Sequence, residues 1–121
     1  MHPMPSAEVL QSLVGEELGQ VSLDPFGVQF RFDRWGLSVQ CNITHVEPDG
    51  ARHIYDCTKL GGPPLVLHRL LQKLVTSVER EELAFKLNFT DGATLIVHTE
   101  IGPFECGQLY RLDGTGVFIV Y

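Results

Sequence analysis

The sequence predicts an α+β fold: a mainly antiparallel sheet of about seven or eight strands, one main amphipathic helix packed on it, and a short N-terminal helix. Short segments of alternating apolar and polar residues are separated by Gly, Pro and Asp, which is typical of strands joined by tight turns. One longer segment, residues 64–80, has Leu and Val at helical spacing. The chain has 121 residues and is 44% hydrophobic, so a single domain over residues 1–121 is expected.

The N-terminal helix is predicted by its two end signals. In PSAEVLQSLVG, Ser6 can accept a hydrogen bond from the first turn as an N-cap. Gly15 stands where a C-terminal stop is expected, because glycine adopts left-handed backbone angles without steric cost.

Turn chemistry then fixes the expected register of the strands in residues 18–57. We take residues 24–27 and 33–36 as four-residue loops, and residues 48–50 as a three-residue loop with Gly last. Four strands would then form an antiparallel meander with one apolar face, since a slip of one residue would turn that face to solvent. The expected pairs are Leu23–Val28, Val21–Phe30, Phe32–Leu37, Phe30–Val39, Val28–Cys41, Glu47–Ala51, His45–His53, Ile43–Tyr55 and Cys41–Cys57.

Residues 64–80 are expected to form the main helix, which would cover the apolar face of the sheet. The prolines at its start suit a first helical turn. Its apolar stripe consists of Leu67, Leu70, Leu71, Leu74, Val75 and Val78.

Strands are expected again after this helix. A three-residue loop at 90–92 pairs Phe89 with Ala93 and Phe85 with Val97, and two further strands end the chain. The segments 18–46 and 78–101 therefore resemble each other as hairpin units on either side of the helix. They can reflect an internal duplication, or simply the general likeness of amphipathic hairpins.

The order LxGxxLxxV (Leu13–Val21), then F-x-F with an alternating strand, then F-x-D-G-x-x-L-x-V (Phe89–Val97) covers most of the chain. In this order the sequence resembles a family of small uncharacterised bacterial proteins, a domain of unknown function. The resemblance carries no activity and no functional residue to this chain.

The net charge of −6 and the absence of Lys/Arg clusters argue against nucleic acids and anionic membranes as partners. The start of the chain, MHPMPSAEVL, lacks the features of a signal peptide, and no segment is apolar enough to span a bilayer. We therefore expect a cytoplasmic protein, and no cofactor is predicted.

One constellation suggests metal binding: Cys41-x3-His45 and His53-x3-Cys57, in which the expected register places Cys opposite Cys and His opposite His. Residues four apart on a strand are ~13 Å apart, whereas zinc ligands lie within ~2.3 Å of the ion, so one four-ligand site is excluded. Two alternatives remain: a half-site of both histidines with Glu47, or a partly buried histidine pair. We predict no metal and favour the partly buried histidine pair. Repulsion between the two rings when both are protonated would make stability mildly sensitive to pH.

Catalysis is not expected. Cys106 stands near Glu100 and Glu105, which would raise its thiol pKa rather than activate it. The cysteines are expected to be reduced core residues. The sequence contains no nucleophile elbow, P-loop, dinucleotide fingerprint or HExxH motif.

Two features favour a protein partner. Phe26 and Trp35 stand in the middle of expected hairpin loops, where polar residues are the norm, although either ring can also fold back onto the core. If Val117, Ile119 and Tyr121 face inward, then Phe118 and Val120 face outward and could form an apolar patch with Ile96.

We therefore predict a non-enzymatic interaction domain, immunity-like or antitoxin-like, that self-associates as a homodimer. The alternative is a small-molecule binder or enzyme with a pocket between helix and sheet that uses His45, His53 and Tyr55.

Overall fold

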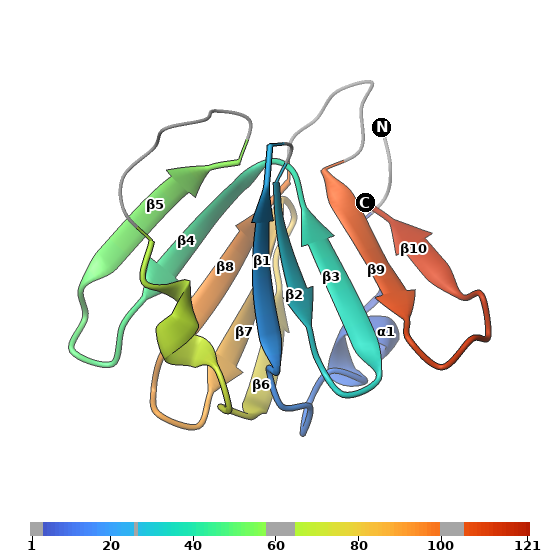
Figure 1. Cartoon of the computed structure of the whole chain (residues 1–121), viewed down its shortest axis with the longest axis horizontal. Coiled ribbons are helices and arrows are strands. Elements are labelled where there is room, and N and C mark those ends of the chain that lie inside the picture. The colour runs from blue at the N-terminus through green and yellow to red at the C-terminus, as the bar shows by residue number, and fades with distance from the viewer. Residues whose placement is uncertain (1–3, 26, 58–64, 100–105) are drawn as a thin grey trace.

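The computed structural model describes residues 4–25, 27–57, 65–99 and 106–121, which form two five-stranded antiparallel sheets (Figure 1). The helical elements are α1 (Ala7–Gln11) and a 3-10 helix, η1 (Leu67–Leu70). The strands are β1 (Gln20–Asp24), β2 (Gly27–Arg31), β3 (Trp35–Val39), β4 (Asn42–Val46), β5 (Arg52–Asp56), β6 (Val75–Arg80), β7 (Ala84–Phe89), β8 (Thr94–His98), β9 (Gly107–Arg111) and β10 (Phe118–Val120). Within the described ranges, no helix is long and apolar enough to cross a membrane.

The two sheets pack through their apolar inner faces. The first has the strand order β1-β2-β3-β9-β10 and the second β5-β4-β8-β7-β6. Their inward side chains form one buried cluster, to which both sheets contribute fully buried residues such as Leu37 and Leu95. Phe85 of β7 meets Tyr121, which follows β10, edge to face with ring centroids 5.5 Å apart. The alternating pattern along the strands is therefore explained by sheet-on-sheet packing.

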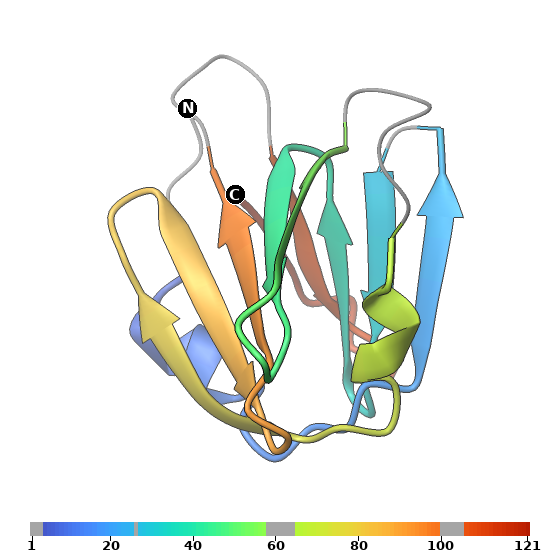
Figure 2. The same cartoon turned by 90° about the vertical axis from the view of Figure 1, so that its left-hand side faces the viewer.

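The short N-terminal helix is confirmed. The Ser6 side chain accepts a hydrogen bond from the Val9 amide at 3.2 Å, but the helix ends at Gln11 with Ser12 as its C-cap, before the expected stop at Gly15. Leu10 and Leu13 point into the core, and α1 contacts β6. Figure 2 shows α1 and η1 on opposite sides of the molecule, so each helps to close one side between the sheets.

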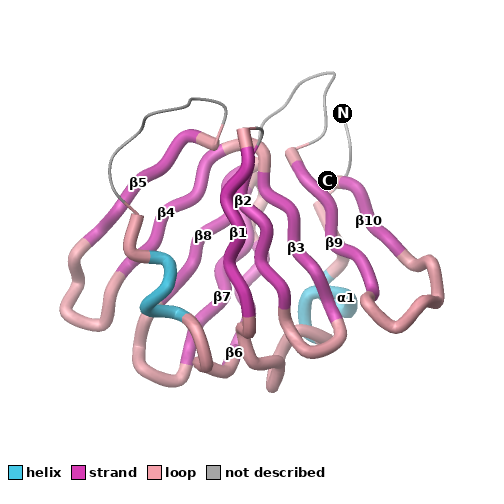
Figure 3. The backbone as a smooth tube through the Cα atoms, viewed as in Figure 1, coloured by secondary structure: helices cyan, strands magenta, loops and turns pink. Residues whose placement is uncertain are grey.

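The predicted main helix over residues 64–80 is wrong, and with it the α+β class. Its described residues form η1 and the edge strand β6, and helices occupy two short pieces of the described chain (Figure 3). The register between β6 and β7 shifts between Val75 and Ser77, so that Thr76 is an extra, bulged residue. The bulge leaves Val75 and Val78 buried with two exposed residues between them. This three-residue spacing imitates a helical stripe, and the β-branched residues at 75, 76 and 78 favour the strand.

The predicted four-stranded meander is also wrong, because the chain changes sheets after β3. Gln40 N donates to Cys106 O at 2.7 Å in the first sheet, whereas Cys57 N donates to Cys41 O at 2.8 Å in the second. The hairpin around residues 33–36 differs from the prediction by two residues. Since a shift of two preserves the side-chain alternation, the predicted apolar face is retained. The pairs found there are Phe30–Leu37 and Val28–Val39, in place of Phe32–Leu37, Phe30–Val39 and Val28–Cys41.

The other registers are confirmed. The first hairpin pairs Leu23 with Val28, and the β4–β5 hairpin pairs His45 with His53. The three-residue loop at 90–92 is also present, since Phe89 N donates to Ala93 O at 2.9 Å.

The two halves of the chain have the same topology. Each half forms a three-stranded meander in one sheet, β1-β2-β3 or β6-β7-β8, and then a hairpin in the other sheet, β4-β5 or β9-β10. The hairpin of each half pairs with the third strand of the other half, as β4 with β8 and β9 with β3. The predicted hairpin units do not match these halves: 18–46 includes β1, β2, β3 and β4, whereas 78–101 begins inside β6 and includes β7 and β8.

Candidate interaction surface

The turn between β9 and β10 sets the geometry of the C-terminal hairpin. Arg111 Nη2 donates to Asp113 Oδ2 at 2.6 Å, and Thr115 N donates to Asp113 Oδ1 at 3.2 Å. These hydrogen bonds lower the pKa of Asp113 to about 2, so the carboxylate is charged at neutral pH. Gly114 and Gly116 have φ values of +81° and +75°, which favour glycine. This turn chemistry holds the two strands in one register.

That register places Tyr110, Phe118 and Val120 together on the outer face of the first sheet; we call these three residues the hairpin surface. Phe118 stands opposite Tyr110 and is 61% exposed, and Val120 is half-buried. The Tyr110 ring lies against Gly36 of β3, where a Cβ atom would collide with it. Its hydroxyl donates to Gln29 Oε1 at 3.5 Å. Tyr110 is therefore fixed flat on the sheet, while Phe118 projects to solvent.

β10 is also an outer strand of the first sheet and pairs with β9 alone among the described strands (Figure 1). Arg111 N donates to Val117 O at 2.9 Å, and Tyr121 N donates to Gly107 O at 3.1 Å. Because backbone groups alternate in direction along a strand, the residues between them, such as Phe118, point their N–H and C=O away from β9. The exposed side chains and an edge that no other described strand pairs with thus belong to the same short strand.

A polar cluster lies at the end of the β4–β5 hairpin. The rings of His45 and His53 have centroids 5.7 Å apart. His53 Nε2 and Glu47 Oε2 are 2.7 Å apart, and Arg69 of η1 donates to the other Glu47 oxygen. The hydrogen bonds from His53 and Arg69 lower the pKa of Glu47 to about 2. Glu47 therefore joins β4, β5 and η1.

His45 is the buried member of this cluster. It is 2% exposed, and its Nδ1 has no hydrogen-bond partner among the described residues. Burial lowers the pKa of His45, which outweighs the opposite effects of Glu47 and Asp91. His45 pairs with Leu95 of β8, just as Leu109 pairs with Leu37 in the other sheet. A polar ring thus occupies the place that a leucine fills in the equivalent hairpin.

The zinc interpretation finds no geometric support in the part of the chain that is described. The Cys41–Cys57 and His45–His53 pairs do lie opposite each other, as the register predicted. Nevertheless, no three His, Cys, Asp or Glu residues in the described ranges are placed to hold a metal ion.

The three cysteines are buried. Burial, together with Asp56 and Asp24, raises the pKa of Cys57 to about 12. A thiol with this pKa is protonated at neutral pH, and it is therefore a poor nucleophile.

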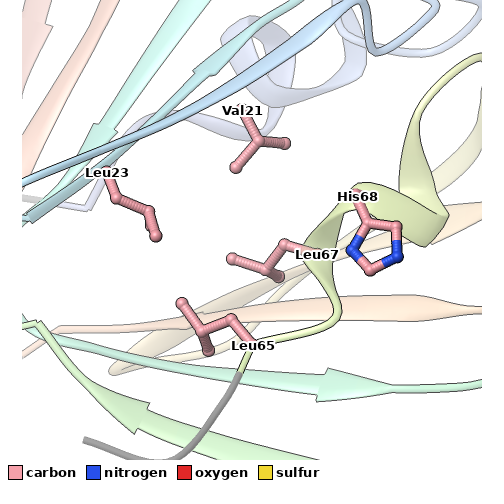
Figure 4. A pocket seen from close by; sticks show the side chains of 5 residues that line it. All are labelled: Val21, Leu23, Leu65, Leu67 and His68. Atoms are coloured by element: carbon pink, nitrogen blue, oxygen red, sulfur yellow. The ribbon is translucent and has the colours of Figure 1, made fainter. Parts of the chain in front are cut away.

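A small apolar pocket lies between β1 and η1 (Figure 4). Its volume is roughly 160 Å³, below the range of about 300–1,000 Å³ that is usual for drug-sized ligands. It is lined by Val21, Leu23, Leu65, Leu67 and His68. The predicted ligand site of His45, His53 and Tyr55 does not line this pocket, and the helix expected to cover that site is absent.

Among the predicted interaction residues, Phe118 and Val120 lie together on the hairpin surface, but the others that the structure describes do not join them. Trp35 is the first residue of β3 and 5% exposed, because the shifted hairpin register moves it from the loop into the strand. The Arg111 guanidinium covers its ring at 5.2 Å. Ile96 is 8% exposed and belongs to the second sheet, away from Phe118. Phe26 lies outside the described residues.

Sequence reasoning missed Tyr110. The signal was present, because Tyr110 occupies an outward position in the alternating segment GQLYR. Its contact with Gly36 depends on the pairing of β9 with β3, which no local pattern indicated.

Comparisons with known proteins found no matching family model, no matching curated protein and no matching solved structure. The resemblance to a family of small uncharacterised bacterial proteins therefore stays a prediction.

Proposed function

We propose that this protein is a non-enzymatic interaction domain of the cytoplasm that self-associates through the hairpin surface. The observation that carries the proposal is Phe118, which is 61% exposed and stands next to Tyr110 and Val120 on an outer strand. Single exposed apolar residues are common, but adjacent ones on a sheet face are typical of binding surfaces.

The composition of the hairpin surface supports this role. Aromatic residues are enriched at the centres of protein interfaces, where they bury a large area at a small cost in side-chain entropy. Burying the Phe118 side chain against a partner would contribute about 2 kcal/mol. Tyr110 is already held against Gly36, so it loses little freedom on binding.

The chemistry of the interior supports a binding role over catalysis. Burial raises the pKa of Cys57 to about 12, so this thiol stays protonated and is a poor nucleophile near neutral pH.

The test is the solution mass, measured by light scattering over a wide range of protein concentration, for wild type and Val120→Lys. We expect wild type to dimerise and the lysine variant to remain monomeric, because a buried ammonium group on the hairpin surface would lack a partner.

Ile54→Lys is the matched control. Ile54 is 64% exposed and stands opposite Thr44 in the β4–β5 hairpin, as Val120 stands opposite Gln108 in the β9–β10 hairpin. It should leave the dimer intact. A wild-type monomer at every concentration, or equal disruption by both lysines, would contradict self-association through the hairpin surface.

A further inference from the structure

We propose that β10 pairs antiparallel with β10 of a second copy, so that the first sheets of two molecules join into one continuous sheet. This inference rests on the proposed self-association and specifies its geometry. It distinguishes pairing at the strand edge from stacking of two outer faces.

The backbone of β10 has the donors and acceptors for such pairing. Val117 and Tyr121 face β9 through their hydrogen bonds to Arg111 and Gly107. Phe118 and Val120 therefore direct their N–H and C=O groups to the opposite side. In an antiparallel ladder, each of these two residues can exchange both of its backbone hydrogen bonds with the residue opposite it in the second copy.

Within the described ranges, the other three outer strands carry charges or a covering segment, and β10 does not. Natural edge strands usually carry charges or are covered, because a bare edge invites pairing with another chain. Asp24 ends β1, whereas β5 begins with Arg52 and ends with Asp56. Strand β6 contains the charged residues Glu79 and Arg80. The segment after α1 also covers its edge, because it forms backbone hydrogen bonds with Val75. By contrast, β10 consists of Phe118, Ile119 and Val120 and has no charge.

The occupant that fits this edge is a second copy of the same strand. A twofold axis through Ile119 places Phe118 of each copy opposite Val120 of the other, and pairs of aromatic and β-branched residues stabilise sheets. The net charge of −6 disfavours contact between most surfaces of two copies, but no charged side chains of β10 would oppose each other. The same pairing brings the two copies of the hairpin surface side by side.

Centring the axis on Ile119 uses all three residues of the strand. A shift of the register by one residue would place Phe118 and Val120 opposite residues whose backbone N–H and C=O groups point to β9 instead of to the second copy. A larger shift would leave part of β10 unpaired. In the centred register, Ile119 and its copy form a non-hydrogen-bonded pair with Cα atoms about 4.5 Å apart. That separation lies within the range that a disulfide can span.

The experiment is cross-linking of Ile119→Cys under mild oxidation by glutathione disulfide, read on a non-reducing gel. We expect a reducible covalent dimer. Leu23→Cys is the matched control, since it places an exposed thiol on β1 at the opposite edge of the same sheet and should stay monomeric on the gel. The three natural cysteines are buried, and wild type measures any cross-linking that they contribute.

Hydrogen exchange on wild type gives a second measurement that needs no substitution. The amides of Phe118 and Val120 should exchange at least about 10-fold more slowly at concentrations where the dimer forms. A dimer that Val120→Lys splits, but with neither the cross-link nor this protection, would overturn strand pairing and leave the proposed self-association standing. A monomer at every concentration would overturn both, and would leave the edge of β10 to a strand of a different protein.

Discussion

At the scale of single residues, His45 is the clearest departure from the packing rules of the core. It is 2% exposed and has an unpaired Nδ1, at a place where the equivalent hairpin has Leu109. A buried polar atom without a partner costs about 1–3 kcal/mol. The surrounding Glu47, His53 and Arg69 contacts hold the hairpin together despite this cost.

The lowered pKa of His45 predicts a loss of stability in mild acid. Its ordinary pKa is 6.5, so below this pH the unfolded chain binds a proton that the folded state resists. The stability of the fold with neutral His45 is fully present above pH 6.5, and part of it is lost as the pH falls below this value. We expect His45→Leu to show a smaller drop in the urea midpoint between pH 8 and pH 5 than wild type. Some drop should remain, because burial also lowers the pKa of His98.

The control for this titration is His68→Gln, since His68 is exposed on η1. It should keep the wild-type pH profile. Parallel profiles for wild type and His45→Leu would show that His45 does not cause the acid sensitivity.

Gly107 is a second residue whose identity the packing dictates. A Cβ atom there would collide with the Ser38 carbonyl and with the Tyr121 ring, whose hydroxyl donates to Ser38 O at 2.6 Å. We expect Gly107→Ala to lower the free energy of unfolding by about 1–3 kcal/mol. Gly19→Ala, which would meet one backbone oxygen at 3.7 Å, should change it by less than about 0.5 kcal/mol. Chemical denaturation measures both, and equal effects would contradict this packing argument.

At the scale of elements, local turn chemistry was a better guide than spacing, although it gave the wrong register at residues 33–36. The registers at residues 48–50 and 90–92 could be predicted. In each hairpin, the pairing that puts glycine at the last loop position also puts the apolar residues on one face. The segment 64–80 could not, because a bulge in β6 produces the same spacing as a helix. The pairing of β3 with β9 could not be predicted either, since nothing local encodes it.

The same limits explain the candidate site. Alternation in the last strand predicted that Phe118 faces outward, and the structure places it there. Trp35 was assigned to a loop because residues 33–36 allow either a two-residue or a four-residue turn, and only the two-residue turn brings Trp35 under Arg111. Ile96 was grouped with Phe118 because the sequence does not reveal that they belong to different sheets.

The strand assignment of β6 predicts unequal effects of two neighbouring substitutions. Val75 is 1% exposed, whereas Leu74 is 41% exposed. Val75→Ala should therefore lower the free energy of unfolding by about 2 kcal/mol, and Leu74→Ala by less than about 1 kcal/mol. In a helix both would lie on one buried stripe, so similar losses by denaturation would contradict the strand.

At the scale of the whole molecule, each half of the chain completes the sheet of the other. The third strand of each meander pairs with a hairpin from the other half of the chain, since β8 pairs with β4 and β3 pairs with β9. The stability of one half is therefore inseparable from the presence of the other, as in an interface between two obligate subunits.

This arrangement predicts that the chain can be divided between its halves. Fragments 1–60 and 61–121, expressed together as separate chains, should co-purify and give the β-sheet circular dichroism spectrum of the whole protein, while either fragment alone should not fold. Division of the chain at Gly114 is the control. The short peptide after this point contains β10 and buries too little surface to stay associated with the rest of the protein. Folding of either half alone, or no association between the halves, would contradict mutual completion.

The pairing of β3 with β9 also has a consequence for synthesis on the ribosome. When β3 emerges, the residues that will cover its free edge, Gly107–Arg111, have not yet been translated. The nascent first meander must wait with Leu37 and Val39 incompletely buried until the last hairpin leaves the exit tunnel. Folding is then completed through contacts between distant segments, which generally form more slowly than local ones, and the unpaired edge of β3 stays exposed in the growing chain until then.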